Sequence, residues 1–187
     1  MKAVIDMLSF KIDDELTLRI MNERDAYDAF KEVDASRDYL ATWLPWVNYT
    51  HSAEDYKKFI QFTRDEFAKE SSFHFGIYNK NTFIGGFSLN KVNRTDNKVE
   101  FGYWLGKSHQ KRGIITRVVS TMTDFVFNEW DVHRIEIHVC ELNEPSRKVP
   151  ERLGFSKEAV LCDAMRLDGR YHNLLIYGKL NPNHVNL

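Results

Sequence analysis

The chain has 187 residues, of which 43% are hydrophobic and 28% charged, and its formal net charge is −1. This length suffices for one domain with a substantial core, so we expect a single domain over residues 1–187. The balanced charge creates no field that would attract nucleic acid or an anionic membrane, so neither is expected as a partner.

The sequence predicts neither export nor membrane insertion. Asp6 and Lys11 interrupt the first 15 residues, which therefore lack the apolar core of a signal peptide. No apolar run approaches the roughly 20 residues that a membrane span requires. The two cysteines, Cys140 and Cys162, form no CxxC pair and are interpreted as reduced thiols. We therefore expect a cytoplasmic protein.

The first part of the chain predicts one strand followed by three helices. Leu16–Met21 alternates as a strand does, and a helix with an acidic first turn is expected from Asn22 to about Val33. A short helix at about Ser36–Trp43 should end before the next proline, because a residue that precedes proline is pushed out of the α region. An amphipathic helix is expected at about Ser52–Lys69, capped by its serine.

Strands dominate the middle of the chain. The runs Phe73–Asn79 and Phe83–Val92 are separated by turn residues and predict a hairpin. Lys98–Gly106 predicts a third consecutive strand, and a helix with a buried apolar stripe is expected from Thr116 to about Glu129. His133–Cys140 alternates strongly and predicts another strand.

The last part of the chain predicts a helix and a strand pair. The helix lies within Asn143–Phe155, and Pro150 is expected to kink it. Two strands then flank a turn at Asp168-Gly169, and residues 184–187 are expected to form a frayed tail. The order β-α-α-α-β-β-β-α-β-α-β-β predicts a mixed sheet with helices on its faces.

The segment from Lys98 to Phe127 carries most of the functional information. A strand leads through a basic, glycine-containing turn directly into an amphipathic helix. Free backbone N–H groups at a helix start favour anions, and cations nearby add to that preference. Four basic residues cluster around this turn: Lys107, Lys111, Arg112 and Arg117. The segment therefore predicts a site for a polyphosphate, such as that of a nucleotide-type cofactor.

The turn Gln110–Ile115 resembles the Q/R-x-x-G-x-G/A pyrophosphate loop of the GCN5-related N-acetyltransferases, the GNAT superfamily. Gly113 would let the backbone approach a phosphate closely, whereas Ile115 departs from the usual Gly or Ala. The surrounding order is EFGYWLGKSHQKRG, a helix, a strand, and NEPSRKVPERLGF, with WLPW earlier in the chain. This order is similar to the RimJ/RimL branch, the ribosomal-protein N-terminal acetyltransferases, over essentially the whole chain.

The resemblance implies the GNAT fold: an α/β (α+β) protein whose central mixed, mostly antiparallel sheet carries helices on both faces. The sheet would splay open between the strands Lys98–Leu105 and His133–Cys140, and acetyl-CoA, a co-substrate, would enter that wedge. The seven histidines show no ligand spacing, so no metal is assigned. The implied cofactor-binding residues are Tyr103, Trp104, Leu105, Gln110, Lys111, Arg112, Gly113, Ile114, Ile115, Thr116, Asn143 and Ser146.

The resemblance also suggests catalytic roles. Glu100 occupies the position where many GNAT enzymes carry a general base, although it could instead be a surface charge paired with an arginine. Ser146 would lie near the sulfur and protonate the departing thiolate, or it could only cap a helix. Asn143 would bond the pantetheine arm or serve as the N-cap. Trp43 and Trp46 are typical of core positions, although one of them could instead line the acceptor channel.

The predicted function is direct transfer of acetyl from acetyl-CoA to an amine. The resemblance favours the α-amine of a protein N-terminus, such as that of a ribosomal protein. Two alternatives stay open: acetylation of a small amine such as an antibiotic, polyamine or amino acid, and a non-catalytic acetyl-CoA sensor. The sequence leaves the oligomeric state open, a homo-oligomer included.

Overall fold

A computed structural model describes residues 8–184, so the predicted tail beyond His184 and the first residues of the N-terminal segment lie outside it. Its centre is an eight-stranded sheet in the order β1-β2-β3-β4-β5-β6-β8-β7. The strands are β1 Ser9–Lys11, β2 Leu16–Ile20, β3 Phe73–Asn79, β4 Thr82–Asn93, β5 Lys98–Leu105, β6 Arg134–Cys140, β7 Ser156–Leu167 and β8 Arg170–Leu180. The α-helices are α2 Ala26–Ala35, α3 Arg37–Ala41, α4 Ala53–Ala68, α5 Ile114–Asn128 and α6 Glu144–Arg152. Short 3-10 turns are η1 Glu23–Asp25, η2 Pro45–Tyr49, η3 Lys107–His109 and η4 Pro182–His184.

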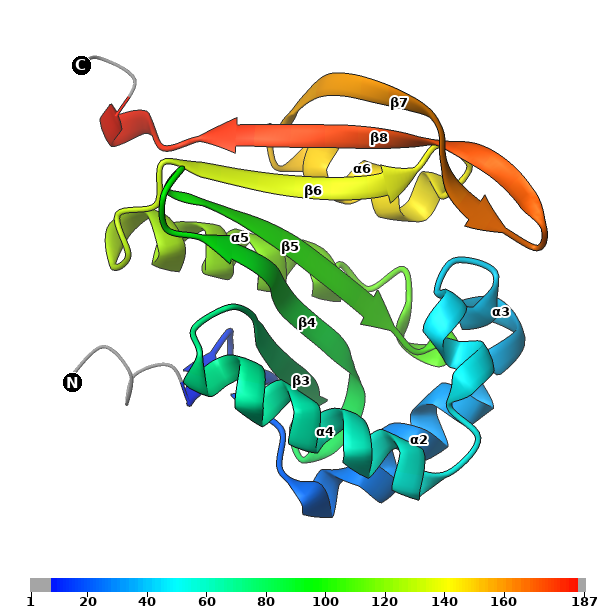
Figure 1. Cartoon of the computed structure of the whole chain (residues 1–187). Coiled ribbons are helices and arrows are strands. Elements are labelled where there is room, and N and C mark those ends of the chain that lie inside the picture. Colours follow the sequence, from blue (N-terminus) through cyan, green and yellow to red (C-terminus); the bar gives the residue numbers. More distant parts are fainter. Residues whose placement is uncertain (1–7, 185–187) are drawn as a thin grey trace.

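Neighbouring strands are antiparallel except for β5 and β6, which are parallel. Figure 1 shows these two strands side by side at one end and diverging toward the other. Helices α2 and α4 lie on one face of the sheet, α5 and α6 lie on the other, and α3 lies near the open end of the divergence (Figure 1). The predicted fold class is therefore confirmed.

Two apolar cores hold these layers together. The larger lies between the sheet and α5, whose buried stripe includes Val118, Val119, Met122 and Val126. The smaller lies between α2, α4 and the other face of the sheet, with Trp104 packed against its edge. Because burial of one large aliphatic side chain contributes about 1.5–3 kcal/mol, these stripes fix the helices on the sheet.

Most predicted elements appear within a few residues of their expected bounds. Ser52 caps α4 by accepting a hydrogen bond from the backbone N–H of Asp55, as expected. Strand β1 was not predicted, because three residues carry too little alternation to be recognised. Helix α5 begins at Ile114 rather than Thr116, since Gly113 is already its N-cap.

The last third of the chain follows the prediction with one difference. Pro150 was expected to kink the helix; α6 contains it and continues through Arg152. The Asp168-Gly169 turn has φ values of 46° and 78°, so both residues are left-handed, as a tight type I′ hairpin requires.

A β-bulge shapes β4 where it faces the middle of β5. The register shifts between Leu89 and Lys91, which leaves Asn90 as the additional residue. A Cβ at Gly102 would lie 2.5 Å from the Asn90 amide nitrogen, so a larger residue there would displace this side chain. The bulge thereby directs Asn90 toward Glu100, to which its amide donates at 3.2 Å.

Candidate active site

The site originates where β5 and β6 part. Their parallel register runs from Lys98–Arg134 to Phe101–Ile137 and goes no further within residues 8–184. From Gly102 to Leu105, β5 stays paired with β4 on its other edge, so its backbone groups toward β6 are released from the ladder. A cavity of about 370 Å³ lies in the resulting wedge.

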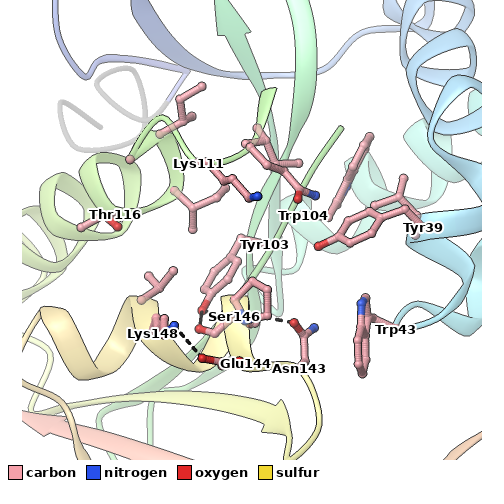
Figure 2. Close-up of a pocket in the computed structure, with 18 of the residues that line it drawn as sticks. Tyr39, Trp43, Tyr103, Trp104, Lys111, Thr116, Asn143, Glu144, Ser146 and Lys148 are labelled. Atoms are coloured by element: carbon pink, nitrogen blue, oxygen red, sulfur yellow. Dashed lines mark hydrogen bonds and ion pairs between the residues drawn. The ribbon is translucent and has the colours of Figure 1, made fainter. Parts of the chain in front are cut away.

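All the predicted site residues except Glu100 and Arg112 line this cavity. Figure 2 shows side chains converging from β5, the start of α5, the start of α6 and the region of α3. The predicted residues that line it are Tyr103, Trp104, Leu105, Gln110, Lys111, Gly113, Ile114, Ile115, Thr116, Asn143 and Ser146. Sequence segments more than 40 residues apart thus form one site, while the roles assigned to them stay predictions.

One wall of the cavity is the start of α5. Gly113 is the N-cap with φ +67°, and no side chain caps the helix there. The amide groups of the first turn, from Ile114 to Thr116, therefore have no partner inside the helix and lie at the cavity. Lys111 also has a positive φ of 60°, a conformation that non-glycine residues rarely adopt and that is often found at functional sites. This wall fits an anionic group such as a pyrophosphate.

The cations at the cavity differ from those the sequence suggested. Lys111 lines it as expected, whereas Arg112 is exposed and Arg117 pairs with Asp13 at 3.0 Å. Lys148 lines the cavity and pairs with Glu144, as Figure 2 shows.

Sequence reasoning missed Arg152, which lines the cavity and donates to the Thr116 hydroxyl at 3.2 Å. It lies four residues after Lys148 on the same face of α6, and this spacing could have identified it.

The start of α6 forms the opposite wall. Asn143 accepts a hydrogen bond from the backbone N–H of Ser146 at 3.3 Å, so Asn143 is the N-cap of this helix. The Ser146 hydroxyl donates to the Tyr103 hydroxyl at 3.3 Å, and the Tyr103 hydroxyl donates to the Ser146 carbonyl at 3.0 Å. Burial raises the pKa of Tyr103 well above its usual value, so the phenol stays protonated. Tyr103 and Ser146 thus connect β5 to α6 across the wedge (Figure 2).

An apolar and aromatic wall closes the third side. Tyr39, Leu40, Trp43 and Leu44 come from the region of α3, and Trp104 faces them from β5. Of the two early tryptophans, Trp43 lines this cavity, whereas Trp46 packs edge-on against Trp104 with ring centroids 5.9 Å apart. That this wall belongs to an acceptor channel stays a prediction.

Glu100 lies at the closed end of the wedge. It pairs with Glu136 in the parallel register of β5 and β6, one pair before the strands part. Besides the Asn90 bond, its carboxylate lies 3.6 Å from Nδ1 of His138. The other ring nitrogen of His138 lies 3.1 Å from the Glu136 carboxylate. Although burial alone would raise the pKa of Glu136, hydrogen bonds from Arg134 and His138 lower it to about 2, so this carboxylate is charged. Glu100 is therefore half-buried in a polar cluster beside the cavity and does not line it.

None of the helices within residues 8–184 is long and apolar enough to cross a membrane. Within the same range, no group of three or more His, Cys, Asp or Glu side chains is placed to hold a metal ion.

Comparison with known proteins agrees with the geometry. The family model of the acetyltransferase (GNAT) domain matches residues 15–156. YdaF of Bacillus subtilis (strain 168) is 29% identical over 175 residues, 93% of this chain and 96% of YdaF. The ribosomal-protein-serine acetyltransferase of Escherichia coli (strain K12) is 25% identical over 173 residues, 92% of this chain and 96% of that protein.

The solved structures lead to the same family. RimL, a ribosomal L7/L12 alpha-N-protein acetyltransferase solved with coenzyme A, matches with a TM-score of 0.87 at 25% identity, covering 92% of this chain and 97% of that one. The wedge between two parting parallel strands and the uncapped helix start that faces it agree with the domain match over residues 15–156. This chain therefore belongs to the GNAT family of acetyltransferases, and its relatives include ribosomal-protein acetyltransferases.

Proposed function

We propose that this protein binds acetyl-CoA in the wedge and transfers the acetyl group directly to the α-amine of a protein N-terminus, such as that of a ribosomal protein. The observation that carries the proposal is a single cavity with an anion-binding helix start on one side and an aromatic wall on the other. The relatives named above as ribosomal-protein acetyltransferases support the choice of acceptor. Such an acceptor implies a cytoplasmic enzyme.

The α5 side of the cavity suits the cofactor's phosphates. The free amides of the first turn would bind the pyrophosphate, and Lys111 and Arg152 would supply positive charge. The pantetheine arm is an extended chain with two amides, and the unpaired edge of β5 from Gly102 to Leu105 offers backbone partners for it. The acetyl thioester would then lie near Tyr103 and Ser146.

The reaction needs the amine as a free base. Its nitrogen attacks the thioester carbon, a backbone N–H near Trp104 or Leu105 polarises the carbonyl oxygen, and the C–S bond breaks with its electron pair on sulfur. The nitrogen loses one proton, for which Glu100 is the proposed base, directly or through a water molecule. The sulfur gains one proton, for which the Ser146 hydroxyl is the proposed donor. Water returns to the serine the equivalent of the proton that the amine released, so the products are an amide and free CoA.

A panel of acceptors tests the proposal by the release of free CoA thiol. Short peptides with a free N-terminus should be turned over, while the same peptides with a blocked N-terminus and an internal lysine should not. Mass spectrometry should place the acetyl group on the α-nitrogen. Turnover of spermidine or free amino acids without turnover of peptides would replace this acceptor by a small amine. Acetyl-CoA binding without turnover of any amine would make the protein a sensor.

A further inference from the structure

The proline inside α6 has a consequence for the site. In an α-helix the N–H of residue 150 would donate to the carbonyl of residue 146. Pro150 has no N–H, so it cannot make this bond. The carbonyl concerned belongs to Ser146, and the Tyr103 hydroxyl donates to it at 3.0 Å. The Tyr103 hydroxyl from β5 therefore replaces the helical N–H as a donor to this carbonyl.

The same contact determines what Tyr103 can do for Ser146. The single proton of the Tyr103 hydroxyl is directed to the Ser146 carbonyl, which leaves the phenolic oxygen free to accept. It accepts from the Ser146 hydroxyl at 3.3 Å. This hydrogen bond holds the serine oxygen on the cavity side of α6, and the serine O–H turns from the phenol to the sulfur when negative charge develops there.

We propose that Pro150 and Tyr103 position the Ser146 hydroxyl for the departing thiolate: the proline frees the carbonyl, the carbonyl orients the phenol, and the phenol holds the serine. Tyr103 and Pro150 act through Ser146 and are positioning residues. The inference rests on the proposed function, because Ser146 is the proposed donor to sulfur. The phenol keeps its proton in the step, and the proton that Ser146 gives to sulfur is replaced from water, so no other reactant is needed.

The burial of the participants supports the arrangement. Pro150 is buried, and burial is the largest cause of the raised pKa of Tyr103. Because the phenol at this contact is buried, loss of the hydrogen bond should leave the carbonyl poorly solvated, so the bond from Tyr103 is also expected to contribute to stability. This dual role permits a test by activity and an independent test by unfolding.

The activity test is a double-mutant cycle on kcat with a peptide acceptor. Tyr103→Phe should lower kcat about tenfold, the effect of one weakened hydrogen bond in the transition state, and leave the KM for acetyl-CoA unchanged. In the Ser146→Ala background the same change should have no further effect, because the phenol then has no serine to hold. Tyr177→Phe is the matched control: its hydroxyl donates to Glu151 of the same helix at 2.7 Å, and its loss should leave kcat unaltered.

The unfolding test measures the urea midpoint and does not depend on turnover. Tyr103→Phe should lower the midpoint clearly in the native background, where the Ser146 carbonyl loses its partner. In a Pro150→Ala background, residue 150 has an N–H for that carbonyl, and the loss should be much smaller.

The outcomes separate the two ideas. Equal midpoint losses in both backgrounds, or a Tyr103→Phe enzyme with normal kcat, would overturn the positioning inference while the proposed function stands. The inference would also be overturned if the kcat losses of Tyr103→Phe and Ser146→Ala multiplied in the double variant. Two residues that act independently have additive effects on the activation free energy. Normal kcat in Ser146→Ala alone would remove the serine from the mechanism, and with it the inference. A native enzyme that acetylates no amine would refute the proposed function itself.

Discussion

Replacing Gly113 with alanine separates the cost of backbone strain from the loss of cofactor binding. Gly113 has a φ of +67°, and a Cβ added there would meet no protein atom within 4 Å. The protein therefore has space for the methyl group, and the stability cost comes only from the left-handed backbone, about 1 kcal/mol. For a chain of this size that cost should lower Tm by about 2–4 °C.

Gly169 provides a matched control. It has a φ of +78°, and a Cβ there also meets nothing within 4 Å, but it lies in the β7–β8 turn away from the cavity. Gly169→Ala should therefore lower Tm by a similar amount. Only Gly113→Ala places its methyl group in the cavity, against the surface that the pyrophosphate would contact.

The decisive measurement is the stabilisation by acetyl-CoA. At a ligand concentration about 100 times Kd, the native protein and Gly169→Ala should gain about 2.7 kcal/mol. A tenfold weaker Kd for Gly113→Ala would reduce this gain to about 1.4 kcal/mol at the same concentration. Calorimetric titration gives Kd directly. Equal affinity in both alanine variants would refute the assignment of this helix start to the pyrophosphate.

Three further predictions follow from individual contacts. Glu100→Gln should slow turnover by about 10²- to 10⁴-fold, most at low pH where the acceptor amine is protonated, and leave acetyl-CoA affinity unchanged; rates equal to those of the native enzyme at every pH would exclude this residue as the base. Asn143→Ala removes the N-cap of α6 and should cost about 1 kcal/mol in urea unfolding, and an unchanged midpoint would contradict the capping role. Burial lowers the pKa of His74 from 6.5 to about 4, so the unfolded state binds more protons than the folded state between these pH values. The stability contributed by neutral His74 is therefore fully present above pH 6.5 and is lost as pH falls toward 4. The free energy of unfolding should decrease by about 3 kcal/mol over that window, and His74→Gln should flatten the curve; a slope unaffected by this substitution would refute the assignment.

The sequence was sufficient to predict the helices and strands that have a strong hydrophobic period or a clear terminal residue. The apolar stripe of α5 and the alternation of β6 were both recognisable, and Gly113 marked the loop before the helix. These features are local, because they depend on residues within one or two turns. The position of the wedge was implied by the family resemblance, since no local pattern indicates where two parallel strands stop pairing.

The parts that escaped prediction are long-range contacts. Arg117 belongs to the basic cluster in the sequence, yet its guanidinium pairs with Asp13, more than 100 residues earlier, and it does not line the cavity. Arg152 enters the cavity because α6 packs beside α5, which brings it to Thr116. Pro150 looked like a local defect, and only the position of β5 shows which side chain bonds the carbonyl that it leaves free. Each of these outcomes depends on which elements become neighbours.

The parity of β5 explains how one strand serves both substrates of the proposed reaction. Side chains of consecutive residues point to opposite faces of a sheet, so Tyr103 and Trp104 leave the strand in opposite directions. Tyr103 reaches α6 and Ser146, on the side where the thiolate would depart. Trp104 faces the aromatic wall from α3, on the side where the amine would enter. The backbone between these two residues is unpaired toward β6, and it is therefore the natural place for the acetyl group to lie between donor and acceptor.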